Sequence, residues 1–140
     1  MRYFLNFLKI LLLAYLIFIV TNFNNNIFSN HDLIGSWYSN LDNNEIKLLF
    51  NFDNSFSLSL INKINSDSSS SYKGFYTTDF NKSPVSLDLK KIKDINYSMF
   101  TVLNFINKDS IRMAFFSLNK KTRDISLSDN NSFGLRKVSK

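Results

Sequence analysis

The chain has 140 residues, 44% of them hydrophobic, with 15 Phe and 6 Tyr, and its formal net charge is +6. This length suits one domain rather than two, and the apolar fraction is too high for a disordered chain. The absence of cysteine excludes disulfides, thiolate metal sites, thiol redox chemistry and a lipidated N-terminal cysteine.

The N-terminal segment, residues 1–22, has a basic start and an apolar centre. Arg2 and Lys9 both precede the continuously apolar residues 10–20. A basic region followed by such a run is typical of a signal peptide, whereas a membrane-spanning helix needs about 20 apolar residues. Residues 3–20 come near that length only if Asn6 is tolerated and Lys9 extends to the lipid headgroups. We therefore expect one N-terminal hydrophobic helix, either an uncleaved signal anchor or a cleaved signal peptide.

Both interpretations place the rest of the chain on the extracytoplasmic side of a membrane, because the positive charges stay on the cytoplasmic side. The protein would be membrane-anchored, or secreted or periplasmic if the segment is cleaved. Residues 23–31 are expected to form a polar linker and residues 32–140 the folded domain. His31 is the sole histidine. It is expected to be solvated, and without cysteine or a second histidine no zinc site is expected.

Beyond the linker the hydrophobic period is two, which is typical of strands with one buried face. Residues 45–52 and 56–64 alternate in this way on either side of Asp53-Asn54, so they are predicted to form a hairpin. Asn107-Lys108-Asp109 predicts a second hairpin. The predicted strands are residues 33–39, 45–52, 56–64, 72–78, 85–91, 99–106, 110–117 and 133–138, with 125–128 as a candidate ninth strand.

Eight or nine antiparallel strands fit an up-and-down barrel or a two-sheet sandwich. An eight-stranded barrel has no exposed edge, and its interior is filled by side chains or holds one small ligand. Gly35, two residues before Trp37, would let the first strand bend across one end of the barrel while the indole closes it. The predicted fold class is all-β: an antiparallel eight-stranded barrel preceded by one hydrophobic helix.

Several short motifs follow one another along these strands. They are Gly35-Ser36-Trp37, then residues 74–79 (Gly-Phe-Tyr-Thr-Thr-Asp), then residues 84–89 (Pro-Val-Ser-Leu-Asp-Leu), and finally Asp109-Ser110-Ile111-Arg112. The first resembles the Gly-Xaa-Trp start of the lipocalin superfamily. The ordered set, which spans residues 33 to 138, resembles a family of small, uncharacterised bacterial lipocalin-like domains. The resemblance implies a lipocalin-like barrel and no established activity.

The resemblance also implies structural roles for particular residues. In lipocalins an arginine from a late strand packs over the indole of the Gly-Xaa-Trp motif. This implies that Arg136 covers Trp37, with Arg123 as the second choice. The alternative is that Arg136, like Arg112, is simply an exposed charge on a strand. The family commonly has Arg-Pro before its last strands, but here Asp124 follows Arg123, so a role tied to that turn is not expected. The remaining motif residues expected to be structural are Gly35, Gly74, Asp79, Pro84 and Asp88.

No catalytic constellation is evident in the sequence. There is no Gly-Xaa-Ser-Xaa-Gly motif and no glycine-rich phosphate loop. We expect Asp79 to cap a turn and Asp88 to pair with a nearby lysine; a carboxylate pair for acid–base chemistry is the alternative. We therefore expect no enzyme, no catalytic residue, no metal and no cofactor.

The basic residues are spread along the chain, and export argues against nucleic-acid binding. The densest basic groups are Lys90-Lys91-Lys93 and Lys120-Lys121-Arg123. They are interpreted either as solvated turns or as groups attracted to anionic lipid headgroups. Besides the membrane, which the N-terminal segment would contact, the expected partner is a small hydrophobic ligand.

The first functional hypothesis is a non-catalytic module that binds a small apolar or amphiphilic ligand inside the barrel. The alternative is a structural or interaction protein of the cell envelope with a packed, ligand-free barrel, which the high phenylalanine content favours. The residues expected to line the ligand site are Phe50, Phe56, Leu58, Tyr76, Phe100 and Phe115.

Overall fold

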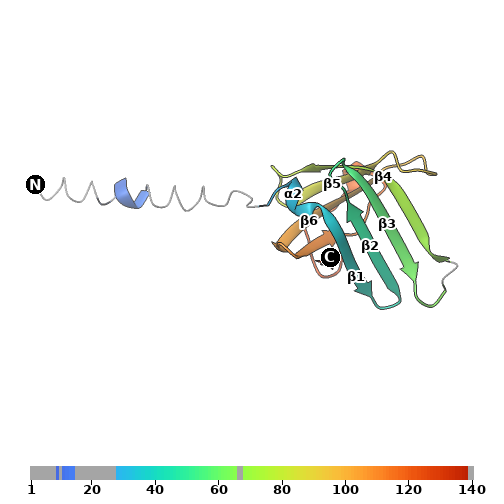
Figure 1. Ribbon diagram of the computed structural model, residues 1–140. Helices are drawn as coiled ribbons and strands as arrows, with labels where there is room; N and C mark the ends of the chain where they lie inside the picture. Colours follow the sequence, from blue (N-terminus) through green and yellow to red (C-terminus); the bar gives the residue numbers. More distant parts are fainter. Residues whose placement is uncertain (1–8, 10, 15–27, 66–67, 139–140) are drawn as a thin grey trace, which may run out of the picture.

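The computed structural model describes residues 9, 11–14, 28–65 and 68–138 and shows a closed barrel of antiparallel strands (Figure 1). The order of the strands around the barrel is their order along the chain, so β8 returns to pair with β1. The all-β, eight-stranded antiparallel barrel predicted from the sequence is confirmed. The strands are β1 (Gly35–Leu41), β2 (Asn44–Phe50), β3 (Ser55–Asn62), β4 (Ser70–Asp79), β5 (Val85–Lys90), β6 (Met99–Asn107), β7 (Ser110–Ala114) and β8 (Ser132–Lys137).

The described part of the N-terminal segment is short. Lys9 and residues 11–14 are helical. The rest of the predicted signal anchor or signal peptide (1–22), and residues 23–27 of the predicted linker, lie outside the described residues. Among the residues that are described, no helix is both long and apolar enough to cross a membrane. The end of the predicted linker forms the short helix α2 (Asn30–Leu33), where Asp32 accepts a hydrogen bond from the backbone of Ser29 at 2.9 Å.

Both predicted hairpins are present. β2 and β3 pair without interruption from Asn44 opposite Asn62 to Phe50 opposite Phe56. In their connecting turn Asn54 has a φ of 61°, a left-handed conformation that asparagine tolerates better than most residues. The β6–β7 hairpin has a bulge between Phe105 and Asn107.

The predicted ninth strand at residues 125–128 is wrong, because these residues form an irregular loop. The side chain of Asn131 occupies the backbone groups that a sheet would need. Its amide nitrogen donates to the carbonyl of Ser126 at 3.1 Å, and its oxygen accepts from the amide of Ser128 at 2.7 Å. A local loop therefore replaces the strand.

The interior of the barrel is packed with apolar side chains contributed by every strand. Burial of each large side chain stabilises the fold by about 1.5–3 kcal/mol, offset mainly by chain entropy. The largest fully buried side chains are Trp37, Leu48, Phe50, Leu58, Tyr76, Leu87, Leu89, Leu103, Ile111, Met113 and Leu135, together with Leu33 of α2.

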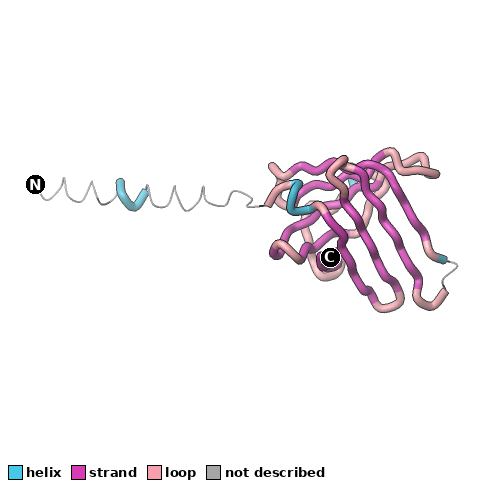
Figure 2. Tube along the Cα trace, viewed as in Figure 1, coloured by secondary structure: helices cyan, strands magenta, loops and turns pink. Residues whose placement is uncertain are grey.

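One end of the barrel, called here the closed end, is covered by α2 and an aromatic cluster. The indole of Trp37 packs edge-on against Phe105 at 6.3 Å between ring centroids, and Phe28 stacks on Phe105 at 4.6 Å. The Trp37 indole N–H donates to the carbonyl of Leu33 at 2.7 Å. These contacts close the end at which β1 begins, as the sequence predicts for Trp37. The chain connections gather at this end and at the opposite, open end (Figure 2).

A loop of residues 115–131, called here the covering loop, leaves β7 at the open end and packs on the outer face of β5 and β6. It includes the 3-10 helix η2 (Lys120–Thr122). Phe100 in β6 exchanges two backbone hydrogen bonds of 2.8 Å with Ser117 of the loop. Consequently β5 is buried on both faces, including Ser86 and Asp88, which point away from the barrel interior.

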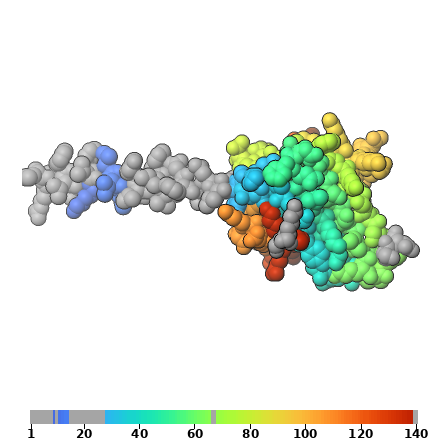
Figure 3. All heavy atoms as spheres, viewed as in Figure 1, coloured from blue at the N-terminus to red at the C-terminus, as the bar shows by residue number. Residues whose placement is uncertain are grey.

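The seam that closes the barrel is short. β1 and β8 pair at Trp37 with Lys137 and at Tyr38 with Arg136, whereas β1 pairs with β2 along its whole length. Figure 3 shows the red end of β8 beside the blue start of β1. Gly35 has a φ of +127°, which disfavours any side chain there, and a Cβ would lie 2.9 Å from Cε of Lys137.

Candidate functional site

The open end of the barrel holds an apolar cavity of about 400 Å³, called here the mouth cavity. Its walls come from β1, β2, β3, β4 and β8 and from the start of the covering loop. Its rim carries the polar side chains of Asn44, Asn62, Ser68 and Ser70. The apolar side chains that line it are Leu41, Ile46, Leu60, Phe115, Phe116 and Phe133.

Strand register explains why these side chains converge. Ile46 in β2 lies opposite Leu60 in β3, and Leu60 lies opposite Ser70 in β4. Directly paired residues point to the same face of a sheet, so all three face the interior. Each lies at the end of its strand nearest the open end, and the fully packed core begins below them. The cavity therefore opens to solvent at one end and ends on packed side chains at the other.

Four of the six residues predicted to line a ligand site lie deeper, in the packed core. Phe50, Phe56, Leu58 and Tyr76 are buried, and none of them lines the mouth cavity. Phe50 and Tyr76 pack edge-on at 4.8 Å between ring centroids. The Tyr76 hydroxyl donates to the carbonyl of Asn51 at 3.1 Å, and burial raises the pKa of this phenol. These four side chains therefore belong to the packed core below the mouth cavity and do not contact the cavity itself.

Phe115 lies where the mouth cavity meets solvent, and its side chain is 51% exposed. It is the one predicted lining residue that contributes to this cavity. Its neighbour Phe116 lines the same cavity and is more buried. No sequence pattern pointed to Phe116, because Phe115 and Phe116 follow the end of β7, where the period-two pattern no longer applies.

Phe100 does not line the interior, so the prediction that it lines the ligand site is wrong. It pairs with Asp88, and both residues point to the outer wall. The guanidinium carbon of Arg123 lies 5.4 Å from the centroid of the Phe100 ring. The covering loop shields the outer face of β6, so this strand carries apolar side chains on both faces, and its sequence lacks the alternation that would show which face points inward.

Arg136 does not cover Trp37, which corrects the role implied by the lipocalin resemblance. Arg136 is exposed on the outer face of β8, opposite Tyr38. The adjacent Lys137 takes the expected place, with Nζ 5.2 Å from the centroid of the indole. Phe133 and Leu135 point inward, so the same face of the strand next carries residue 137. Arg123, the second choice, lies on the outer wall.

Two further motif residues, Gly74 and Asp79, have local structural roles, and a third, Pro84, lies next to a strand. A Cβ on Gly74 would lie 2.6 Å from the carbonyl oxygen of Lys90, so only glycine fits this approach of two strands. Asp79 accepts a hydrogen bond from the amide of Asn81 at 3.1 Å and so caps the turn after β4. Pro84 directly precedes β5.

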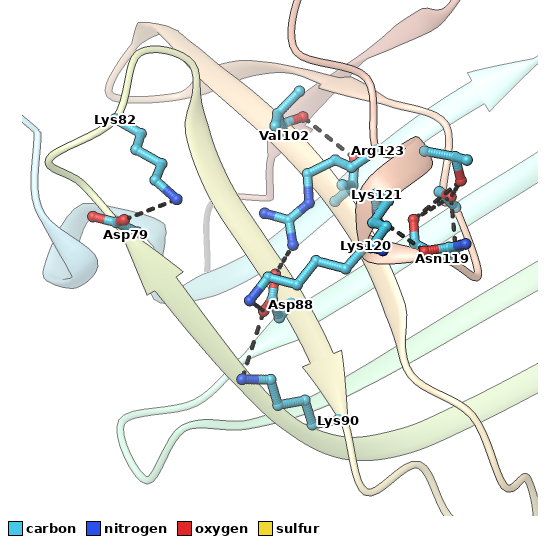
Figure 4. Close-up of polar contacts among 12 residues, drawn as sticks. Asp79, Lys82, Asp88, Lys90, Val102, Asn119, Lys120, Lys121 and Arg123 are labelled. Carbon is cyan, nitrogen blue, oxygen red and sulfur yellow. Dashed lines mark hydrogen bonds and ion pairs between the residues drawn. The ribbon is translucent and has the colours of Figure 1, made fainter.

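Asp88 lies in a group of cations on the outer wall of the barrel, under the covering loop (Figure 4). Its carboxylate binds the guanidinium of Arg123, and its other oxygen lies 3.5 Å from Nζ of Lys90 and 3.8 Å from Nζ of Lys120. The lysine partners agree with the expectation for Asp88, but Arg123 is its closest partner. The contact between Asp88 and Arg123 could not be predicted from a local pattern, because it joins residues that are far apart along the chain.

Asp79, the second carboxylate of the alternative enzyme hypothesis, also has a cationic partner, since its carboxylate lies 3.4 Å from Nζ of Lys82. The ion pair of Asp79 lies within the turn between β4 and β5, and that of Asp88 with Arg123 joins β5 to the covering loop. No family model, curated protein or solved structure matches this chain.

Proposed function

We propose that this protein is an extracytoplasmic, membrane-tethered, lipocalin-like barrel that binds a small apolar or amphiphilic ligand without catalysing a reaction. The mouth cavity is the observation that carries this proposal. Its volume of about 400 Å³ lies within the range of about 300–1,000 Å³ that is common for small-molecule sites. Sites of this kind are mostly apolar and carry a few polar groups, which is the composition of the mouth cavity.

The arrangement of the walls favours an amphiphile. Ile46, Leu60 and Phe133 surround the inner part of the cavity and would exclude water from an apolar tail. Asn44 and Asn62 lie at the rim and would hydrogen-bond a polar head that stays in contact with solvent. Because the closed end is covered by α2 and Trp37, the ligand would enter from the open end.

Tethering and the lipocalin-like character are supported by the sequence. Residues 1–22 combine a basic start with an apolar run, and the Gly35-Ser36-Trp37 motif opens the first strand. The indole of Trp37 is covered by a cation from the last strand, although Lys137 fills the place that an arginine takes in lipocalins.

A structural or interaction protein of the cell envelope is the second candidate. The observation that favours it is the filled interior of the barrel. Four of the residues predicted to line a ligand site are instead buried in the packed core: Phe50, Phe56, Leu58 and Tyr76. In that case the mouth cavity would hold no specific molecule. Ligand content therefore separates the two candidates.

The experiment is native mass spectrometry of the full-length protein extracted from the membranes of its own host. Two matched variants test the position of the ligand. Ser70→Trp places a large side chain in the mouth cavity, whereas Ser71→Trp adds the same side chain at an exposed position next to it.

We expect a small-molecule adduct on the wild type and on Ser71→Trp and its loss from Ser70→Trp. Absence of any adduct, or an adduct that Ser70→Trp does not affect, would favour the packed structural protein. The intact mass also shows whether residues 1–22 are retained, as a tether requires.

A further inference from the structure

A second hollow, of about 420 Å³, lies on the outer wall between the β4–β5 turn and the covering loop. We call it the cation pocket. It is separate from the mouth cavity, with which it shares no lining residue. A smaller hollow of about 110 Å³ adjoins it, and Lys82, Ser86, Lys120 and Arg123 line both. The wall of the larger hollow also includes Lys121, Ser83 and the apolar Ile125.

The charges around the two hollows do not balance. Four cations line them, but only two carboxylates do, those of Asp79 and Asp88. Lys121 forms no ion pair within the part of the chain that the structure describes. An excess of two positive charges therefore faces a partly enclosed space, where charge is screened less than on an open surface.

Arg123 provides an independent observation that points to a ligand. Its side chain is only 8% exposed, and its guanidinium contacts Asp88 and the ring of Phe100. Its Nε is buried and has no hydrogen-bond partner among the described residues. A buried donor without a partner costs about 1–3 kcal/mol, and more when it is charged. An oxyanion in the hollow would supply the missing acceptor.

We propose that the cation pocket binds a doubly charged oxyanion, a phosphate monoester group. Two negative charges match the excess charge of the lining. A guanidinium presents several N–H donors in a plane that suits phosphate oxygens, while lysines act as mobile point charges. The Ser83 and Ser86 hydroxyls add neutral donors. This inference does not depend on a ligand in the mouth cavity.

The phosphate could belong to a lipid headgroup or to a soluble molecule. Two exposed apolar side chains on the covering loop favour the headgroup. Ile125, which lines the pocket, is 85% exposed, and Leu118, two residues before Lys120, is 63% exposed. Exposed apolar residues beside lysines are a combination that binds anionic membrane surfaces.

The test uses the full-length protein and two double variants with the same net charge. Lys82→Gln with Lys121→Gln removes two exposed cations from the pocket. Lys93→Gln with Lys108→Gln removes two exposed cations elsewhere. Binding of inorganic phosphate is measured by titration calorimetry, and the Arg123 Nε–H resonance is followed by NMR. Co-sedimentation with phosphatidylcholine vesicles, with and without phosphatidic acid, then distinguishes the headgroup from a soluble source.

We expect the wild type and the control variant to bind phosphate equally and the pocket variant to bind about tenfold more weakly. The Arg123 Nε–H resonance should shift when phosphate is added. If phosphatidic acid increases sedimentation of the wild type more than that of the pocket variant, the source is a headgroup. If only free phosphate distinguishes them, the source is soluble. Equal binding by all three proteins in both assays would overturn the proposal.

Discussion

The ammonium of Lys137 lies over the indole of Trp37, 5.2 Å from the ring centroid, and also donates to the carbonyl of Asp32 at 2.9 Å. One side chain at the end of β8 thus contacts both β1 and α2. The backbone ladder between β1 and β8 is short, so the side chain of Lys137 provides an additional link between the first and last strands.

Replacing Lys137 with methionine should therefore weaken the closed end. The variant loses the cation–π contact and the hydrogen bond to Asp32, so we expect the free energy of unfolding to fall by about 1–2 kcal/mol. Urea denaturation measures this change. Arg136→Met is the matched control, since Arg136 is exposed and a change within about 0.5 kcal/mol is expected. A larger loss for the control than for Lys137→Met would contradict the assignment of the cation.

Gly35→Ala should destabilise the barrel by about 2 kcal/mol. A side chain at a φ of +127° is strained, and the new methyl group would also displace Lys137 from the indole. Gly134→Ala is the control, because a Cβ there meets nothing within 4 Å. Its stability should be unchanged or higher by up to about 1 kcal/mol. Thermal denaturation of both variants checks the difference, and equal melting temperatures would refute it.

Asp88→Asn should lower the free energy of unfolding by about 3 kcal/mol, because it leaves the buried Arg123 guanidinium without a counter-ion. Adding Arg123→Met removes the unpaired charge, so the double variant should be more stable than Asp88→Asn alone. A double-mutant cycle in urea gives the coupling between the two residues. Additive losses would show that the ion pair does not hold the covering loop in place.

Acid should destabilise the fold through three carboxylates. Hydrogen bonds from the Ser29 backbone, the Tyr38 hydroxyl and the Ser55 hydroxyl lower the pKa of Asp32, Glu45 and Asp53, respectively, below their ordinary values of 3.8 for aspartate and 4.5 for glutamate. A lowered pKa in the folded state means that the stabilisation is complete above the ordinary value. It is lost as the pH falls through the lowered one.

The melting temperature should therefore be level above about pH 5 and fall below about pH 4.5. Asp53→Asn tests one contribution, because its side chain cannot ionise, so its melting temperature should fall less over the same range. Ser55→Ala removes the hydroxyl whose hydrogen bond contributes most to the lowered pKa of Asp53. This variant should therefore also show a smaller fall in melting temperature. A profile identical to that of the wild type in both variants would contradict this origin of the acid sensitivity.

Both hairpins could be predicted from the sequence, because most of β2 and β3 alternates between apolar and polar residues on either side of a turn. The strand count alone also fitted a two-sheet sandwich, so the closed barrel followed from the resemblance to lipocalins rather than from the alternation. Prediction failed where contacts between distant residues decide the structure. Phe100 was assigned to the interior because nothing local shows that the covering loop packs on its face. Asp88 is polar in an alternating strand, which indicates an exposed position, yet Arg123 and the loop bury it.

The position of the candidate site could be predicted only in part. The pattern of a strand shows which side chains face inward, but it does not show how far each lies from the open end. Ile46 and Phe50 have the same orientation in β2, and only the first borders the mouth cavity. The choice of Arg136 rather than Lys137 was an error of one residue, and one residue reverses the face of a strand.

The pairing of the first strand with the last has a consequence during biosynthesis. β1 emerges early, but its second partner is β8, so one edge of β1 stays unpaired until the final strand has been made. An unpaired edge can pair with another chain, and longer delays between contacting segments slow folding. The interval between synthesis of β1 and synthesis of β8 is therefore when the nascent protein is most exposed to aggregation.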